Sequence, residues 1–182
     1  MILNEVAGLR RLVDSFTEFS SLPIAKPERE NLTCTLKDVV KKYKALEHPH
    51  EILLENHTSD EDLWWIHDKG LISQVVSNLI KNSIEACGRS PSQILVELKK
   101  PSKDNVQINV VDNGPGIPDE IQKNVFEPHF STKKSDDPKN IFEDSGMGLG
   151  LSVCQKVIYD HGGEITLKSA PFKTTFSIVL PK

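Results

Sequence analysis

The sequence predicts an α/β protein, a two-layer sandwich in which helices cover one face of a mixed sheet of about five strands. One observation predicts this class, and a second predicts how the chain divides into domains. Segments whose apolar residues recur every three or four positions alternate along the chain with short segments in which every second residue is apolar. The length of 182 residues suits one well-buried domain and an extra piece, because single domains cluster at about 100–150 residues.

The composition excludes several classes of protein. A net charge of −4 with 26% charged residues leaves no basic surplus that would draw the chain to nucleic acid. No stretch is apolar enough to span a bilayer, and the first residues lack the pattern of a signal peptide. Three distant cysteines lie in apolar patterns, so we expect buried thiols in a reducing compartment and hence a cytoplasmic domain: Cys34, Cys87 and Cys154.

The extra piece is residues 1–22, which have the pattern of an amphipathic helix. Pro23 and Pro27 end it and make residues 23–30 a stiff linker to the main domain at 31–182. The helix either packs on its own domain or joins a bundle with other chains, and the linker favours the bundle because it separates the helix from the rest. Its apolar seam alternates steps of four and three: Ile2, Val6, Leu9, Val13 and Phe16.

The main domain alternates strand and helix patterns. Trp64 and Trp65 fall on opposite faces of one expected strand, as in a strand covered on both sides. The histidines lack metal-site spacing on any single element, so we expect them to be surface or core residues. The expected strands cover 51–56, 62–67, 94–98, 106–111, 164–169 and 174–180, and a weak alternation covers 31–36. The expected helices cover 36–46, 68–87, 119–124 and 147–161.

Two asparagines mark the helix that begins at Asp68, a good N-cap, and stops at Gly88. Asn78 and Asn82 lie one turn apart, on a face away from a broad apolar stripe. Asparagine is a mediocre helix former, so the pair suggests a use for the amides, such as an oxygen ligand for Mg²⁺. Solvated asparagines on an exposed face are the alternative.

A second candidate site follows the expected strand at 106–111. Asp112 ends this strand, and Gly114 and Gly116 come directly after it. A carboxylate there can accept a hydrogen bond from an exocyclic amine such as that of adenine, while the glycines let a flat ring approach the backbone. An ordinary Asn–Gly turn with a solvated aspartate is the alternative.

A glycine-alternating stretch, residues 146–151, forms the third candidate site. It runs into a helix, whose unpaired N–H groups attract anions, and therefore suits phosphate. The polar run before it resembles a lid, with Phe126 and Phe130 at one hinge, Gly146 at the other, and Lys133 able to reach phosphate. A bare glycine-rich turn is the alternative.

Taken together, these stretches resemble the four motifs of sensor histidine kinases, in the right order. Residues 78–82 resemble the N box, 112–116 the first glycine box, 126–130 the F box and 146–150 the second glycine box. The resemblance covers about residue 31 to the end. It implies the Bergerat ATP-binding fold of the superfamily that joins gyrase, Hsp90, histidine kinases and MutL. Residues 1–22 are similar to the second helix of a dimerisation and phosphoacceptor hairpin, in the style of nitrogen-regulation kinases.

The resemblance implies a Mg·ATP site. Asp112 would bind the adenine amine, Asn82 would be the protein ligand of Mg²⁺, and Asn78 would lie beside the phosphates. Hydrolysing members of the superfamily have a glutamate at position 78, and an amide cannot act as a general base. Transfer to another acceptor is therefore favoured over hydrolysis. The other implied ATP-binding residues are Gly114, Gly116, Ile117, Phe130, Lys133, Gly146, Met147, Gly148, Leu149, Gly150, Leu151, Thr174 and Thr175.

The chain also departs from the family pattern. None of its six histidines has the context of a phosphoacceptor, so no catalytic histidine is expected in this chain. Lys173 stands where the family usually has glycine, and Met147 where threonine is commoner. We therefore expect a fragment of a longer, dimeric kinase, membrane-anchored in some architectures, whose partners are its own phosphoacceptor hairpin and a response regulator receiver domain.

Two other functions remain open. The chain could be an ATPase or serine kinase of the same superfamily, which predicts phosphate release or transfer to serine. It could also be a nucleotide-binding module without catalysis, which predicts nucleotide binding and no transfer.

Overall fold

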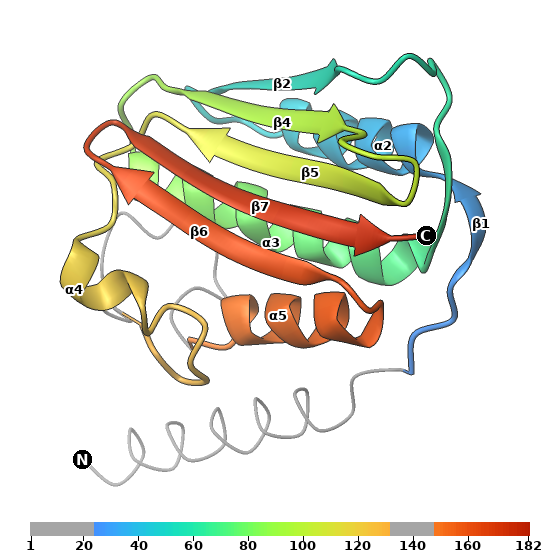
Figure 1. The fold of residues 1–182 in the computed structure, drawn as a ribbon. Coiled ribbons are helices and arrows are strands. Elements are labelled where there is room, and N and C mark those ends of the chain that lie inside the picture. Colours follow the sequence, from blue (N-terminus) through green and yellow to red (C-terminus); the bar gives the residue numbers. More distant parts are fainter. Residues whose placement is uncertain (1–23, 132–147) are drawn as a thin grey trace, which may run out of the picture.

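The computed structural model describes residues 24–131 and 148–182, which form a sheet with helices packed on one of its faces (Figure 1). The predicted helix at 1–22 lies outside the described residues. The predicted two-layer α/β class is confirmed. Of the helices in the two described ranges, none has the length and apolarity needed to cross a membrane.

The main sheet has five strands in the order β2-β4-β5-β7-β6. β2 pairs with β4 in parallel and the other neighbours are antiparallel, so the sheet is mixed, as predicted. In this register Asp112 lies opposite Ile94 on one side and Thr174 on the other. The strands are β2 (Glu51–Asn56), β4 (Gln93–Lys99), β5 (Asn105–Asp112), β6 (Glu164–Ala170) and β7 (Lys173–Pro181).

A small second sheet corrects two predictions. β1 (Glu28–Asn31) pairs with β3 (Trp64–His67), so the linker expected at 23–30 ends in a strand. Trp65 is buried but Trp64 is 52% exposed. The strand is therefore covered on one side only, because β3 pairs with β1 and does not enter the main sheet.

The first described helix begins earlier than predicted. α2 covers Leu32–Lys44, and the side chain of Asn31 caps it by accepting from the Cys34 N–H at 2.9 Å. The weak alternation at 31–36 was therefore misleading, because an N-cap and the first helical turn produce it. Cys34 is exposed and Cys87 half-buried, so the prediction of buried thiols holds only for Cys154.

The central helix is α3 (Lys69–Cys87), which was predicted with its cap and its stop. Asp68 caps it, and Gly88 ends it with φ of 65°. Its apolar stripe packs against the sheet and against the flanking helices α2 and α5 (Gly150–Asp160), while the short α4 (Asp119–Gln122) lies beside β6 (Figure 1). Fully or nearly fully buried residues of the stripe are Leu71, Ile72, Val75, Val76, Leu79, Ile80 and Ile84.

Asp68 joins three parts of the fold. Its Oδ1 accepts from the Leu71 N–H at 3.0 Å and its Oδ2 from the Lys26 N–H at 3.0 Å. Its own N–H donates to Nε2 of His161, the residue that ends α5. Burial alone would raise the pKa of Asp68, but the backbone donors Leu71 and Lys26 bring its pKa below the ordinary value.

Replacing Asp68 with alanine is expected to lower the free energy of unfolding by about 1 kcal/mol, because the cap of α3 is lost. Urea denaturation measures this change. Asp68→Asn is the matched control, since its amide oxygen can still cap, and should lose less. Because the folded pKa is depressed, the charge-dependent stabilisation is complete above the unfolded pKa of 3.8 and disappears as the pH falls through the folded pKa. Equal stability of the alanine variant and the wild type would contradict the capping role.

Candidate nucleotide-binding site

A buried carboxylate lies at the end of β5. Asp112 is 3% exposed and faces the helix layer, on the same side of the sheet as the core. The Ser83 hydroxyl of α3 donates to its Oδ2 at 2.9 Å, and the Gly114 N–H donates to its Oδ1 at 3.0 Å. Each carboxylate oxygen has a second lone pair, so Asp112 can accept a further hydrogen bond from a ligand.

Burial raises the pKa of Asp112, although the hydrogen bonds from Gly114 and Ser83 partly oppose the shift. A raised pKa means that the folded chain disfavours the charged form. The ionised carboxylate therefore costs folding free energy at neutral pH, a feature that is common among carboxylates of binding sites.

Two glycines let the chain turn tightly after Asp112. A Cβ on Gly114 would lie 2.8 Å from Oδ1 of Asp112. Gly116 has φ of +84°, and a Cβ there would lie 2.5 Å from the carbonyl oxygen of Ala170 at the end of β6. Larger residues at either position would push the turn away from the carboxylate and from the sheet.

Ser169 ties this turn to β7. Its hydroxyl accepts from the Ile117 N–H at 2.8 Å and lies 2.9 Å from the Thr174 hydroxyl. Thr174 is buried on the face of the sheet that carries Asp112, whereas Thr175 points to the opposite face. Of the two threonines expected in the site, the structure brings only Thr174 beside Asp112.

The helices α3 and α5 run antiparallel, which brings the two asparagines toward the start of α5. His161, after the last turn of α5, contacts Asp68 before the first turn of α3. Farther along, Cys154 of α5 lies 3.8 Å from the Asn78 amide nitrogen. One turn before Cys154, the first residue of α5 is therefore level with Asn82, since both helices rise about 1.5 Å per residue.

Among the residues that the structure describes, no side chain caps the N-terminus of α5. Leu149 precedes the helix and provides no side-chain cap for its N–H groups. A Cβ on Gly150 would meet nothing within 4 Å. Gly148 is different, because it has φ of +69° and its Cβ would lie 2.6 Å from the carbonyl carbon of His129. Leu149 is buried and Leu151 half-buried, so their side chains anchor the turn, while the backbone N–H groups of Gly150 and Leu151 have no partner in residues 24–131 and 148–182.

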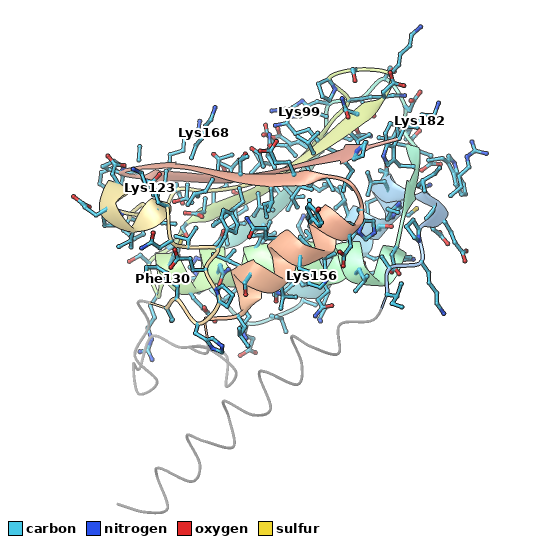
Figure 2. The ribbon with its side chains drawn as sticks, turned by 60° about the horizontal axis from the view of Figure 1, so that its bottom comes forward. Lys99, Lys123, Phe130, Lys156, Lys168 and Lys182 are labelled. Carbon is cyan, nitrogen blue, oxygen red and sulfur yellow. The ribbon has the colours of Figure 1, made fainter. Side chains whose placement is uncertain are left out.

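Phe130 lies at the border of the described site. Its side chain is half-buried, and its carbonyl oxygen approaches the position of a Cβ on Gly148 to 2.8 Å. Figure 2 shows it beyond the starting end of α5. Three expected site residues, Lys133, Gly146 and Met147, lie outside the described residues, as does the rest of the expected lid.

The thiol of Cys154 is fully buried between α5 and α3. Burial raises its pKa to about 12, so it remains protonated at neutral pH and packs as a small apolar group.

Sequence reasoning missed two positioning residues, Ser83 and Ser169. Ser83 had a signal, because it interrupts the apolar stripe of α3 between Ile80 and Ile84 and so had to point inward. Ser169 had none, since its partners Ile117 and Thr174 meet it only when β6 and β7 pair beside the turn.

Comparison with known proteins agrees with this fold. Residues 67–182 match the family model described as histidine kinase-, DNA gyrase B- and HSP90-like ATPase. The chain belongs to this family. Within it, the domain is the ATP-binding catalytic domain of the sensor histidine kinase type, because the similar proteins are sensor histidine kinases.

Three curated relatives show the range of similarity. The adaptive-response sensory kinase SasA of Rippkaea orientalis is 38% identical, over 63% of this chain and 28% of its own length. The nitrogen regulation protein NtrY of Azorhizobium caulinodans is 28% identical, over 93% of this chain and 21% of its own length. The sensory histidine kinase/phosphatase NtrB of Rhodobacter capsulatus is 28% identical, over 100% of this chain and 51% of its own length. This chain thus spans between about a fifth and a half of the length of these relatives.

Solved structures agree with the fold. The nucleotide-free catalytic domain of histidine kinase ThkA superposes with a TM-score of 0.69 at 29% identity, covering 86% of this chain and 96% of that domain. ThkA in complex with response regulator protein TrrA superposes with a TM-score of 0.74 at 28% identity, covering 100% of this chain and 49% of that one.

Two glycine variants test the start of α5. Gly148→Ala is expected to lower the free energy of unfolding by about 1–3 kcal/mol, because alanine would have to adopt a positive φ against the His129 backbone. Gly150→Ala is expected to keep the stability unchanged or raise it slightly, since its site is open and helical, yet to weaken ATP binding where its methyl group meets the phosphates. Thermal denaturation without nucleotide and ATP titration measure the two effects. If both variants changed thermal stability and ATP affinity in the same way, the assignment of Gly148 to the turn and Gly150 to phosphate binding would be contradicted.

Proposed function

We propose that this domain binds Mg·ATP and transfers the γ-phosphoryl group to a histidine of a helix hairpin outside the chain. The observation that carries the proposal is the pairing of a buried carboxylate, Asp112, with the uncapped N-terminus of α5 on the same side of the sheet. Asp112 binds the base, the N-terminus of α5 binds phosphate, and the end of α3 lies between them.

Polarity and shape support the assignment of Asp112 to the adenine end of the site. Asp112 is an acceptor with both oxygens already held in place, so it is preorganised for the exocyclic amine of adenine. Gly114, Gly116 and Ile117 line the approach with backbone, and Thr174 extends it across β7. Fixing the acceptor before the base arrives reduces the entropy lost on binding.

The phosphate end is supported by the backbone donors of Gly150 and Leu151 at the start of α5. The residues there also fit Mg²⁺, because Asn82 offers a hard carbonyl oxygen level with that helix start and phosphates complete the shell. When bound, Mg²⁺ would neutralise phosphate charge. We assign Asn82 as its protein ligand, Asn78 as a neighbour of the phosphates, and Gly148 and Leu149 as the turn that positions the donors. Phe130, Lys133, Gly146 and Met147 complete the proposed site.

Transfer is favoured over hydrolysis by Asn78. An amide cannot take a proton from water, and the Asn78 amide nitrogen is directed toward Cys154. The domain's own residues therefore position the nucleotide and stabilise charge, while the nucleophile must come from elsewhere.

The proposed partners follow from this missing nucleophile. Residues 1–22 would be the second helix of the dimerisation and phosphoacceptor hairpin, 23–30 its connection, and 31–182 the catalytic domain. The full-length protein would be a homodimer that passes phosphate to a response regulator receiver domain, in line with the ThkA complex with TrrA. We also propose that this domain works in the cytoplasm, where ATP is supplied.

The adenine assignment is tested by Asp112→Asn. ATP affinity is expected to fall by at least about tenfold, because a charge-assisted acceptor is lost and the new NH₂ group opposes the donors Ser83 or Gly114. Affinity in the wild type should also weaken as the pH falls through the raised pKa of Asp112. Isothermal titration calorimetry measures both. Ser83→Ala, which keeps the carboxylate, is the control with a smaller loss, and unchanged affinity in Asp112→Asn would refute the assignment.

The transfer itself is tested by mixing this chain with labelled Mg·ATP and a separate hairpin that carries the phosphoacceptor histidine. Acid-labile label on that histidine is the expected result. Free phosphate without labelled hairpin would instead indicate an ATPase, and label on serine would indicate a serine kinase. Nucleotide binding with no product would indicate a module without catalysis. A hairpin with the histidine replaced by glutamine is the control for the label position.

A further inference from the structure

Two acidic side chains face each other on the open side of the sheet, away from the helices. Glu55 of β2 lies directly opposite Glu97 of β4, and Asn109 of β5 is the next residue across the sheet. Figure 2 shows Lys99, which shares a face with Glu97, on the side of the sheet away from α5. Like charges opposite one another in neighbouring strands repel and destabilise the sheet unless a positive charge lies between them.

His57 completes the cluster. It follows β2 directly, and its Nε2 lies 3.2 Å from Oε2 of Glu55 and 3.6 Å from Oε1 of Glu97. All three candidate ligand atoms lie within 4.8 Å of one another. In a tetrahedral zinc site with bonds of about 2.0–2.1 Å, ligand atoms are separated by about 3.3–3.4 Å. The two separations from Nε2 of His57, 3.2 and 3.6 Å, lie close to this range, and Glu55, half-exposed, can rotate to adjust the third.

Glu97 is held so that one oxygen is presented to this cluster. Its Oε2 accepts from the amide of Asn109 at 2.9 Å and from the ammonium group of Lys99 at 2.9 Å. Asn109 is itself 5% exposed and accepts from Gln107. These contacts leave Oε1 facing His57, which is the arrangement by which outer residues orient a metal-binding carboxylate.

We propose that Glu55, His57 and Glu97 form a binding site for a divalent transition-metal ion of the zinc class. One imidazole and two carboxylates suit Zn²⁺ or Co²⁺, whereas Mg²⁺ prefers oxygen ligands alone. The partial exposure of the cluster leaves a fourth position for water. The site is separate from the nucleotide site, because Asp112 faces the helix layer and Glu97 the opposite side of the sheet.

Such an ion would join the edge strand β2 to β4 near the ends of both strands. It would replace the repulsion between Glu55 and Glu97 with shared coordination. We therefore expect Zn²⁺ to raise the thermal stability of the domain in the absence of nucleotide.

The test is titration of the chain with Zn²⁺ alone, without nucleotide, followed by calorimetry and thermal denaturation. The exposed Cys34 is replaced with serine in every sample, so that its thiol cannot bind the metal. Tight binding of one Zn²⁺ ion per chain is expected. His57→Asn and Glu97→Gln should each lower the Zn²⁺ affinity by at least about a hundredfold, and Asn109→Ala by roughly tenfold. Glu51→Gln, on the same strand but outside the cluster, should leave it unchanged.

Co²⁺ absorption gives a second readout that a simple ion pair would not produce. A strong visible band indicates four-coordinate Co²⁺, and it should vanish in His57→Asn, whose folding is checked by circular dichroism. Zn²⁺ affinity that is equal in the wild type and in His57→Asn would overturn the proposal. So would a wild-type chain that gives only the weak band of six-coordinate Co²⁺.

Discussion

The rest of the structure depends on the packing of α3 against the sheet and on the polar contacts at the two ends of that helix. At the start of α3, Asp68 accepts hydrogen bonds from Lys26 of the linker and from Leu71 in the first turn of the helix. Near its end Ser83 donates to Asp112 at the tip of β5. The buried apolar stripe between these points supplies most of the free energy that stabilises this packing. The two carboxylates determine which segments meet the helix ends.

This arrangement explains why the two halves of the proposed nucleotide site lie together. α5 is held antiparallel to α3 by His161 at one end and by Cys154 in the middle. Its N-terminus therefore comes level with Asn82, close to where Ser83 meets Asp112. In the proposed site the base end would depend on a preorganised acceptor, and the phosphate end on backbone donors that have no partner among the described residues.

The sheet separates two kinds of chemistry. Its inner face ends in a carboxylate whose pKa is raised by burial, which suits recognition of an uncharged base. Its outer face carries Glu55 and Glu97 side by side with His57, in contact with water, which suits a cation. Sequence patterns assigned the inner face, because strand ends and glycines lie next to one another in the chain. They missed the outer cluster, since His57 and Glu97 are forty residues apart and meet only through the parallel pairing of β2 with β4.

By itself the sequence determined the α/β class, nearly every strand, the cap and stop of α3, and the motifs of the nucleotide site, because these follow from local periodicity and from residues adjacent in the chain. It misjudged Trp64 and the start of α2, where pairing with β1 and capping by Asn31 override a short apolar pattern. Only the tertiary structure decided which threonine joins Asp112, and that Ser169 connects Thr174 to Ile117. The physical reason is that strand register and helix direction bring together residues whose spacing along the chain carries no such information.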